Sequence, residues 1–249
     1  SIDQEGYNGT FTEDEIAREI SEKSRTINIA LVGKYDLQDA YKSIREALSQ
    51  AGTYNDRKVE VHFVNSEKLT DENVGEALKG MAGVMIGPGF GQRGIDGKFV
   101  AIKYTRTHDI PTFGICLGMQ CIAIEFARNV LGFADANSRE MDEKTPHNVI
   151  DIMEEQKAIT NMGGTMRLGA YECVLQKGSK VFEAYGQEHI QERHRHRYEF
   201  NNDYLEQFEA AGMKAVGVNP DTNLVEVVEI ENHPWFVGVQ FHPELKRSE

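Results

Sequence analysis

The amino-acid sequence predicts an α/β fold: a doubly wound, mostly parallel central sheet flanked by helices, with an antiparallel extension. Two observations predict the parallel part. Short apolar, β-rich runs recur through residues 27–115, and segments with helical periodicity follow them in alternation. A third observation predicts the extension. After Gly132 the alternation stops, although further β-rich runs appear before the C-terminal end of the sequence.

The elements are predicted in chain order from these periodicities and from the turn residues that bound them. The strands of the first half are predicted over residues 27–32, 59–64, 83–86 and 110–115, and its helices over 40–51, 74–81, 99–107 and 117–131. In the second half, residues 133–166 are predicted to form polar turns. Strands are predicted over 168–175, 224–230 and 235–241, and a helix over 204–211.

Residues 1–26 are predicted to be a connector that precedes the domain formed by residues 27–249. Thr12 and Glu15 have the spacing of a capping box, which indicates a short helix start within this connector. No stretch within residues 27–245 has the length and composition of a linker, so we expect one domain there.

Composition excludes several classes of protein. The chain has 249 residues, with 40 acidic against 27 basic side chains and a formal net charge of -13. This balance argues against a nucleic-acid-binding surface, which needs clustered positive charge. No apolar run approaches the roughly 20 residues that span a bilayer, so we expect no membrane partner. The N-terminal residues lack the features of a signal peptide, which favours a cytoplasmic location.

The three cysteines are too few and of the wrong parity for a disulfide framework, which fits a reducing cytoplasm. Cys116 and Cys121 have a spacing that could hold a metal, but a second ligand pair is missing, so no metal site is predicted. Cys121 and Cys173 are interpreted as core residues.

The segment from Gly114 to Gly118 contains the most informative cysteine. An apolar strand precedes Cys116 and an amphipathic helix follows it, which is the strand–turn–helix layout of a nucleophile elbow. Such a tight turn needs small neighbours, and glycines stand on both sides. The start of a helix favours a thiolate, and the Leu117 amide can face a developing oxyanion. The alternative is a buried structural cysteine.

A cysteine nucleophile needs a base and a group that orients it. His242 and Glu244 follow the last apolar strand, and Pro243 fixes the turn between them. Because sites open at the carboxyl edge of parallel sheets, the two side chains can form a base–orienter pair there. The alternative is an exposed loop in which the two residues occur by chance.

Together, the Cys116 elbow and the distant His242-Pro243-Glu244 resemble the class I, or triad, glutamine amidotransferases. Within this family the chain resembles the amidotransferase domain of the CTP synthases from about residue 27 to residue 245. The segments that carry the closer resemblance are 32–35, 39–43, 88–94, 161–169 (Asn-Met-Gly-Gly-Thr-Met-Arg-Leu-Gly) and 192–199 (Glu-Arg-His-Arg-His-Arg-Tyr-Glu).

The resemblance implies hydrolysis of L-glutamine to glutamate and ammonia through a glutamyl thioester. It assigns Cys116 as the nucleophile, His242 as the base and Glu244 as the residue that orients His242. It places the oxyanion on the amides of Gly89 and Leu117. The residues that it implies for glutamine binding are Gly89, Phe90, Leu117, Gln120, Glu140 and Arg197, with Glu140 suited to the α-ammonium group.

One position departs from the family. CTP synthases commonly read Pro-Gly-Gly-Phe-Gly where this chain has Gly87-Pro88-Gly89-Phe90-Gly91. Gly89 keeps its place before Phe90, so the oxyanion donor is expected to survive, whereas Pro88 has no N–H to donate. Phe90 could also offer a ring face to a purine.

The resemblance also implies partners beyond this domain. A full CTP synthase has an N-terminal synthetase domain that converts UTP to CTP with ATP and Mg²⁺ and receives the ammonia. It uses GTP as an activator and is expected to be a homotetramer. The sequence contains no G-x4-G-K-[ST] loop, so no cofactor is expected in this domain and no CTP formation by it alone.

Three other interpretations remain open at the level of sequence. The run from Arg193 to Arg197 could be a metal or RNA tract, although a loop at the glutamine site or a domain interface fits better. The chain could be another amidotransferase or a γ-glutamyl hydrolase on the same fold. It could also be an assembly module without activity, against which the presence of Cys116, His242 and Glu244 argues.

Overall fold

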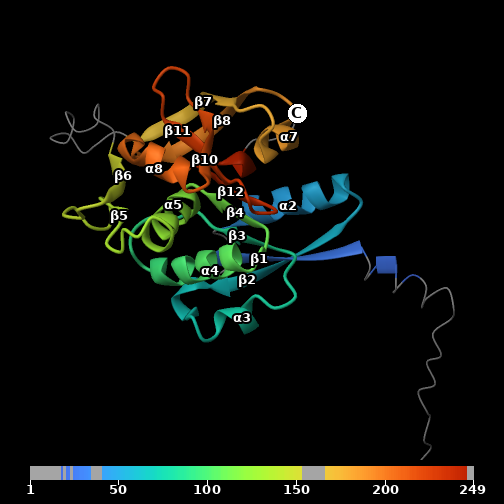
Figure 1. Ribbon diagram of the computed structural model, residues 1–249. Coiled ribbons are helices and arrows are strands. Elements are labelled where there is room, and N and C mark those ends of the chain that lie inside the picture. Colours follow the sequence, from blue (N-terminus) through green and yellow to red (C-terminus); the bar gives the residue numbers. More distant parts are fainter. Residues whose placement is uncertain (1–17, 19–20, 23–24, 35–40, 153–165, 246–249) are drawn as a thin grey trace, which may run out of the picture.

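The computed structural model describes residues 18, 21–22, 25–34, 41–152 and 166–245. Within them, a nine-stranded sheet with the order β2-β1-β3-β4-β12-β11-β10-β7-β8 forms the centre of the molecule (Figure 1). A smaller sheet has the order β5-β6-β9. The strands are β1 (Thr26–Gly33), β2 (Lys58–Asn65), β3 (Gly83–Ile86), β4 (Thr112–Ile115), β5 (Asn137–Ser138), β6 (Asn148–Ile152), β7 (Arg167–Leu175), β8 (His189–His196), β9 (Tyr198–Phe200), β10 (Met213–Val218), β11 (Val225–Ile230) and β12 (Phe236–Val239). The helices are α2 (Lys42–Tyr54), α3 (Val74–Ala77), α4 (Ile95–Thr107), α5 (Leu117–Asn129), α7 (Lys180–Tyr185) and α8 (Leu205–Ala210).

The first half of the large sheet is parallel, as the alternating pattern predicts. β1 pairs in parallel with β2 and β3, β3 with β4, and β4 with β12. Such strands are buried on both faces because helices cover each side. In β1, Leu31 belongs to one core cluster, whereas Ala30 and Val32 belong to the other.

Helices cover both faces of the sheet, so the fold is doubly wound. The first core cluster joins the sheet to α4, α5 and α8, through Ile102, Ile122 and Phe208 among others. The second joins the opposite face to α2 and α7, through Ile44 and Val181. Complete burial of one such side chain contributes about 1.5–3 kcal/mol to folding. The predicted fold class is therefore confirmed.

The antiparallel extension is also confirmed, and it is larger than the sequence indicates. β12, β11, β10, β7 and β8 pair antiparallel in that order. The strands β8 and β10 are not predicted, and the run from Arg193 to Arg197, expected to be a loop, lies mostly in β8. In β8 the residues Glu192, His194 and His196 are buried while the arginines between them point outward. Because both faces carry polar residues, hydropathy does not reveal this alternation.

Several predicted boundaries shift. α3 spans four residues instead of the predicted 74–81, and α4 begins at Ile95 rather than at Phe99. The helix predicted after Thr12 falls mostly outside the described residues, and the boundary of the connector at residue 26 stays a prediction. Among the described helices, none combines the length and apolarity that a membrane span requires.

Candidate active site

The candidate site forms at the carboxyl ends of neighbouring parallel strands. Lys34 follows β1, the loop 87–91 follows β3, Cys116 follows β4, and His242 lies three residues past β12. These strands are adjacent in the sheet, so residues from four separate parts of the sequence meet at one edge.

Cys116 sits on the sharp turn between β4 and α5. Its backbone is at φ 53° and ψ -105°, a sparsely populated region for a residue with a side chain. The Cys116 amide donates to Val239 O at 2.8 Å, which ties the turn to β12. The thiol faces the Arg195 carbonyl at 3.9 Å, and Gln240 Nε2 points at the sulfur from 3.7 Å. The predicted elbow is therefore present, with the sulfur at the start of α5.

Two glycines allow this turn because the backbone around it is crowded. A Cβ atom on Gly118 would lie 2.2 Å from the carbonyl oxygen of Ile86, and a Cβ atom on Gly114 would lie 2.7 Å from the backbone of Gly118. A side chain at position 118 would push the elbow away from β3. A side chain at position 114 would push the strand end away from the start of α5.

Gly118→Ala is accordingly expected to destabilise the fold by more than about 2 kcal/mol, since the clash is with backbone and not with a flexible side chain. Chemical denaturation measures this change. Gly75→Ala is the matched control, because the three atoms nearest to its added Cβ all belong to the side chain of Tyr104, the closest at 3.3 Å. Equal stability of the two variants would contradict this explanation of the elbow.

His242 is held between strand β8 and Glu244. Its Nδ1 lies 2.8 Å from Glu244 Oε1, and its backbone amide donates to Arg193 O at 2.8 Å. The other ring nitrogen, Nε2, is buried and makes no hydrogen bond within the described residues, so it is available to Cys116. Burial lowers the pKa of His242, but the neighbouring Cys116 and the Glu244 carboxylate outweigh burial and raise it to about 10.

A cavity of about 290 Å³ opens beside Cys116, a volume suited to a small ligand. It is lined by all the residues predicted to contact substrate: Gly89, Phe90, Leu117, Gln120, Glu140 and Arg197. A second cavity, of about 360 Å³, shares Cys116, Gly89 and Phe90 with the first and reaches His242 and Glu244. The structure therefore brings every predicted site residue to one place.

The loop 87–91 is held by three charged side chains, of which only Glu140 was predicted as a site residue. Lys98 Nζ donates to Gly87 O at 2.6 Å, and Lys34 Nζ donates to Phe90 O. Glu140 Oε1 accepts from the amide of Gly91 at 3.3 Å. Lys98 is 1% exposed, and burial lowers its pKa. No sequence signal marks Lys98, because a lysine in a helix usually lies on the solvated face.

Gln120 is buried at the base of the cavity. Its Nε2 donates to Tyr198 O at 3.0 Å and to Gln240 Oε1 at 3.2 Å. Tyr198 and Gln240 were not predicted as site residues. Tyr198 acts through its backbone carbonyl, and Gln240 acts through a buried side-chain amide. Neither role is revealed by a pattern of side-chain types in the sequence.

The remaining cysteines lie in the core, as interpreted from the sequence. Cys121 is fully buried in α5, and burial raises its pKa to about 11. Cys173 is buried in β7, and burial likewise raises its pKa. Across the ranges that the structure describes, no group of three or more His, Cys, Asp or Glu side chains is placed to hold a metal ion.

Comparison with known proteins gives consistent results. The profile of the class-I glutamine amidotransferase family matches residues 36–249. The CTP synthase of Bacteroides thetaiotaomicron is 87% identical over 231 residues, which are 93% of this chain and 43% of that protein. The chain thus spans less than half the length of the curated relatives that it matches.

Solved structures agree with the sequence comparison. The chain is similar to the glutaminase domain of Trypanosoma brucei CTPS with bound acivicin, with a TM-score of 0.83 and 37% identity. The similarity covers 89% of this chain and 88% of that one. A glutamine amidotransferase from Thermotoga maritima shares the fold, with a TM-score of 0.55 and 14% identity, over 88% of this chain and 76% of that one.

Proposed function

Since the chain belongs to the class I glutamine amidotransferase family and within it to the glutaminase domains of CTP synthases, we propose that Cys116 hydrolyses the side-chain amide of L-glutamine. The observation that carries the proposal is the arrangement of three groups. Cys116 stands on a strained elbow at a helix N-terminus, beside His242, whose Nδ1 is held by Glu244 at 2.8 Å. This is the order of nucleophile, base and orienting carboxylate that acyl transfer needs.

In the first half of the reaction, His242 takes the thiol proton and the thiolate attacks the carboxamide carbon. The high pKa of His242 means that the imidazolium forms readily beside a negatively charged partner. When the tetrahedral intermediate collapses, the C–N bond breaks and the imidazolium gives its proton to the leaving ammonia. A glutamyl thioester on Cys116 remains.

In the second half, water attacks the thioester carbonyl while His242 takes one of the water protons. The C–S bond then breaks, glutamate leaves, and the sulfur recovers the proton. Both tetrahedral intermediates carry a negative oxygen, for which the amides of Gly89 and Leu117 are the proposed donors. The contacts of Lys98 and Lys34 with Gly87 O and Phe90 O fix the loop that presents Gly89. Pro88 lies in the same loop and has no N–H, so it takes no part.

Glutamine is proposed to bind in the 290 Å³ cavity with its side chain towards Cys116. Glu140 supplies a carboxylate for the α-ammonium group, and Arg197 offers positive charge for the α-carboxylate. Phe90, Leu117 and Gln120 form walls of the same cavity. Acivicin, which is bound in the Trypanosoma brucei domain, is expected to occupy this cavity as well.

Glu140→Gln is expected to raise the KM for glutamine about tenfold to a hundredfold and to change kcat less, because a charge-assisted contact to the substrate is lost. The substitution keeps an oxygen that can accept from Gly91. Steady-state kinetics measures the change. Glu143→Gln is the matched control, since Glu143 is exposed three residues away; an unchanged KM in Glu140→Gln would remove Glu140 from the site.

The activity itself is tested by incubating the chain with L-glutamine and measuring glutamate and ammonia together. The expected result is equal release of the two products. Free glutamine is expected to be preferred over γ-glutamyl peptides. Preference for the peptides would indicate a γ-glutamyl hydrolase instead.

Beyond this half-reaction, we propose that the ammonia is passed to a synthetase domain of the same enzyme, which makes CTP from UTP with ATP and Mg²⁺. Residues 27–249 are then the glutaminase domain, and residues 1–26 are the connector. In the complete enzyme GTP would stimulate glutamine hydrolysis, the assembly would be a homotetramer, and the location would be the cytoplasm. The match covers 43% of the 87% identical relative, which leaves length in that relative for a second domain.

A further inference from the structure

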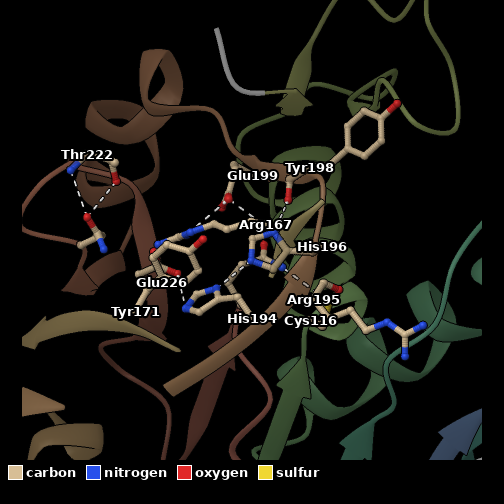
Figure 2. A network of polar contacts seen from close by, with 12 residues as sticks. Cys116, Arg167, Tyr171, His194, Arg195, His196, Tyr198, Glu199, Thr222 and Glu226 are labelled. Carbon is tan, nitrogen blue, oxygen red and sulfur yellow. Dashed lines mark hydrogen bonds and ion pairs between the residues drawn. The ribbon is translucent and has the colours of Figure 1, made fainter. Parts of the chain in front are cut away.

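A cluster of buried ionisable side chains, drawn in Figure 2, adjoins the proposed glutamine cavity. Its members come from four strands and are 6% exposed or less: Arg167 of β7, His194 and His196 of β8, Glu199 of β9 and Glu226 of β11. His196 also lines the cavity itself. The proposed mechanism uses none of these side chains, although buried charge on this scale is costly unless it is compensated.

The cluster contains two carboxyl groups and a single permanent cation. Arg167 Nη1 lies 2.6 Å from Glu226 Oε1 and 3.4 Å from Glu199 Oε1. If both carboxyls were ionised, Arg167 would compensate only one of them. Burial raises the pKa of Glu199 well above its ordinary value and that of Glu226 to about 7. Burial also lowers the pKa of His194 to about 2 and that of His196 to about 3, so the extra proton belongs on a carboxyl group.

The two imidazoles connect the two carboxyl groups in one chain. Glu199 Oε1 lies 3.3 Å from His196 Nδ1, and His196 Nε2 lies 2.7 Å from His194 Nδ1. His194 Nε2 lies 3.5 Å from Glu226 Oε2, an ion-pair distance at which the two atoms form no hydrogen bond in the structure. Figure 2 shows this chain with Arg167 lying between the two carboxyl groups. Each neutral imidazole has one donor and one acceptor nitrogen, so the direction of one bond fixes the direction of the next.

Two arrangements of hydrogen place a donor opposite an acceptor at each of the three contacts. With the proton on Glu199, the carboxyl donates to His196 Nδ1, and both imidazoles carry hydrogen on Nε2. With the proton on Glu226, the carboxyl donates to His194 Nε2, and both imidazoles carry hydrogen on Nδ1. In the second arrangement alone, His196 Nδ1 can also donate to the carbonyl of Tyr198, 3.2 Å away.

The carbonyl of Tyr198 belongs to the proposed glutamine site. It accepts from Nε2 of Gln120, at 3.0 Å, and it directly follows Arg197 in the chain. The preceding strand, β8, offers the Arg195 carbonyl to the Cys116 thiol and the Arg193 carbonyl to the His242 amide. His194 and His196 of β8 therefore enter the cluster, while the carbonyls of Arg193 and Arg195 contact the reacting residues.

We propose that Glu199, His196, His194 and Glu226 share one proton and are positioning residues for glutamine: the location of the proton decides whether His196 donates to the Tyr198 carbonyl. The kinetic consequence rests on the proposed function, whereas the arrangement of hydrogens does not. The other titratable groups that face this chain are Arg167, Tyr171 and Cys173 of β7, Glu192 of β8 and His242 after β12. The positive charges of Arg167 and His242 further disfavour an imidazolium at either histidine.

Two isosteric substitutions separate the arrangements. Glu199→Gln leaves an amide that donates to His196 Nδ1 and so fixes hydrogen on Nε2 of both imidazoles. Glu226→Gln leaves an amide that donates to His194 Nε2 and so fixes hydrogen on Nδ1 of both. Nitrogen-15 NMR of the histidine rings in the full chain is expected to show these opposite tautomers, with neither ring charged near pH 7. An imidazolium at His194 or His196, or the same tautomers in both variants, would overturn the proposal.

The positioning role is tested by the KM for glutamine in the same two variants. The KM of Glu199→Gln is expected to be about fivefold higher than that of Glu226→Gln, the effect of losing one ordinary hydrogen bond. Alkylation of Cys116 by iodoacetamide is expected to change by less than about twofold in both, because the elbow is untouched. Equal KM values in the two variants would overturn the role. Absence of glutamine hydrolysis in every protein, wild type included, would instead reject the proposed function and leave the NMR result standing.

The free energy of unfolding of these variants tests the proposed charges of the cluster. Each single variant retains Arg167 and one carboxylate, so both are expected to stay folded in urea denaturation. The double variant Glu199→Gln/Glu226→Gln leaves the buried guanidinium without a carboxylate. Its loss of unfolding free energy is expected to be far greater than the sum of the losses in the two single variants. Single variants as unstable as the double variant would contradict a shared proton.

Discussion

Cys116→Ala is expected to abolish glutamine hydrolysis and to leave the fold intact. The substitution removes the atom that forms the thioester, and no other thiol can replace it, because Cys121 and Cys173 are buried in the core. Alanine is smaller than cysteine and the elbow needs no bulk at this position, so the free energy of unfolding should change little. The measurement is glutamate release, with chemical denaturation of the same sample.

Cys121→Ala is the matched control for this variant. It also removes one thiol, from the helix that follows the elbow, but leaves Cys116 in place, so it should retain activity despite a small loss of packing. Glutamine hydrolysis at the wild-type rate by the Cys116→Ala variant would reject Cys116 as the nucleophile.

His242→Ala is expected to lower kcat by roughly 10⁴-fold or more, because members of a nucleophile–base unit act together. Without the imidazole, nothing takes the thiol proton and nothing protonates the leaving ammonia. His108→Gln serves as the control, since His108 is exposed at the end of α4 and precedes the amino end of β4, whereas Cys116 follows its carboxyl end. A near-normal rate in His242→Ala would place the base elsewhere.

The same residue predicts a dependence of stability on pH. The pKa of His242 is about 10 in the folded chain, against an ordinary value of about 6.5. A raised pKa means that the folded state binds the proton more tightly than the unfolded state. The resulting stabilisation is complete below about pH 6.5 and is lost as the pH rises towards 10. The stability advantage of wild type over His242→Gln, measured by urea denaturation, should therefore shrink between pH 7 and pH 10.

The parallel half of the fold could be predicted because its strands are apolar throughout. β3 coincides with the predicted range, and β1, β2 and β4 begin or end within two residues of it. The antiparallel half was harder to predict. β8 places glutamate and histidine on its buried face and arginine on its exposed face. Burial therefore alternates along this strand, whereas hydropathy does not. What makes these residues suitable for burial is their mutual pairing, which depends on β7, β9 and β11.

The candidate site could be predicted where chemistry is tied to residue type and local geometry. The elbow around Cys116 and the turn at His242 have sequence signals of this kind, while Glu140 and Arg197 depended on the family resemblance. Lys98, Gln240 and the Tyr198 carbonyl could not be predicted in the same way. Their roles come from three-dimensional contact: a buried ammonium on Gly87 O, an amide beside the sulfur and a backbone oxygen under Gln120.

The most direct test of the proposed function is labelling with 6-diazo-5-oxo-L-norleucine, followed by intact mass and peptide mapping. This glutamine analogue alkylates an activated nucleophile, with loss of N₂, when it is bound next to it. We expect a single adduct, on Cys116, suppressed by excess L-glutamine and absent from Cys116→Ala. An adduct on another residue, an adduct that glutamine does not suppress, or no adduct on the folded chain would contradict the proposed glutaminase site.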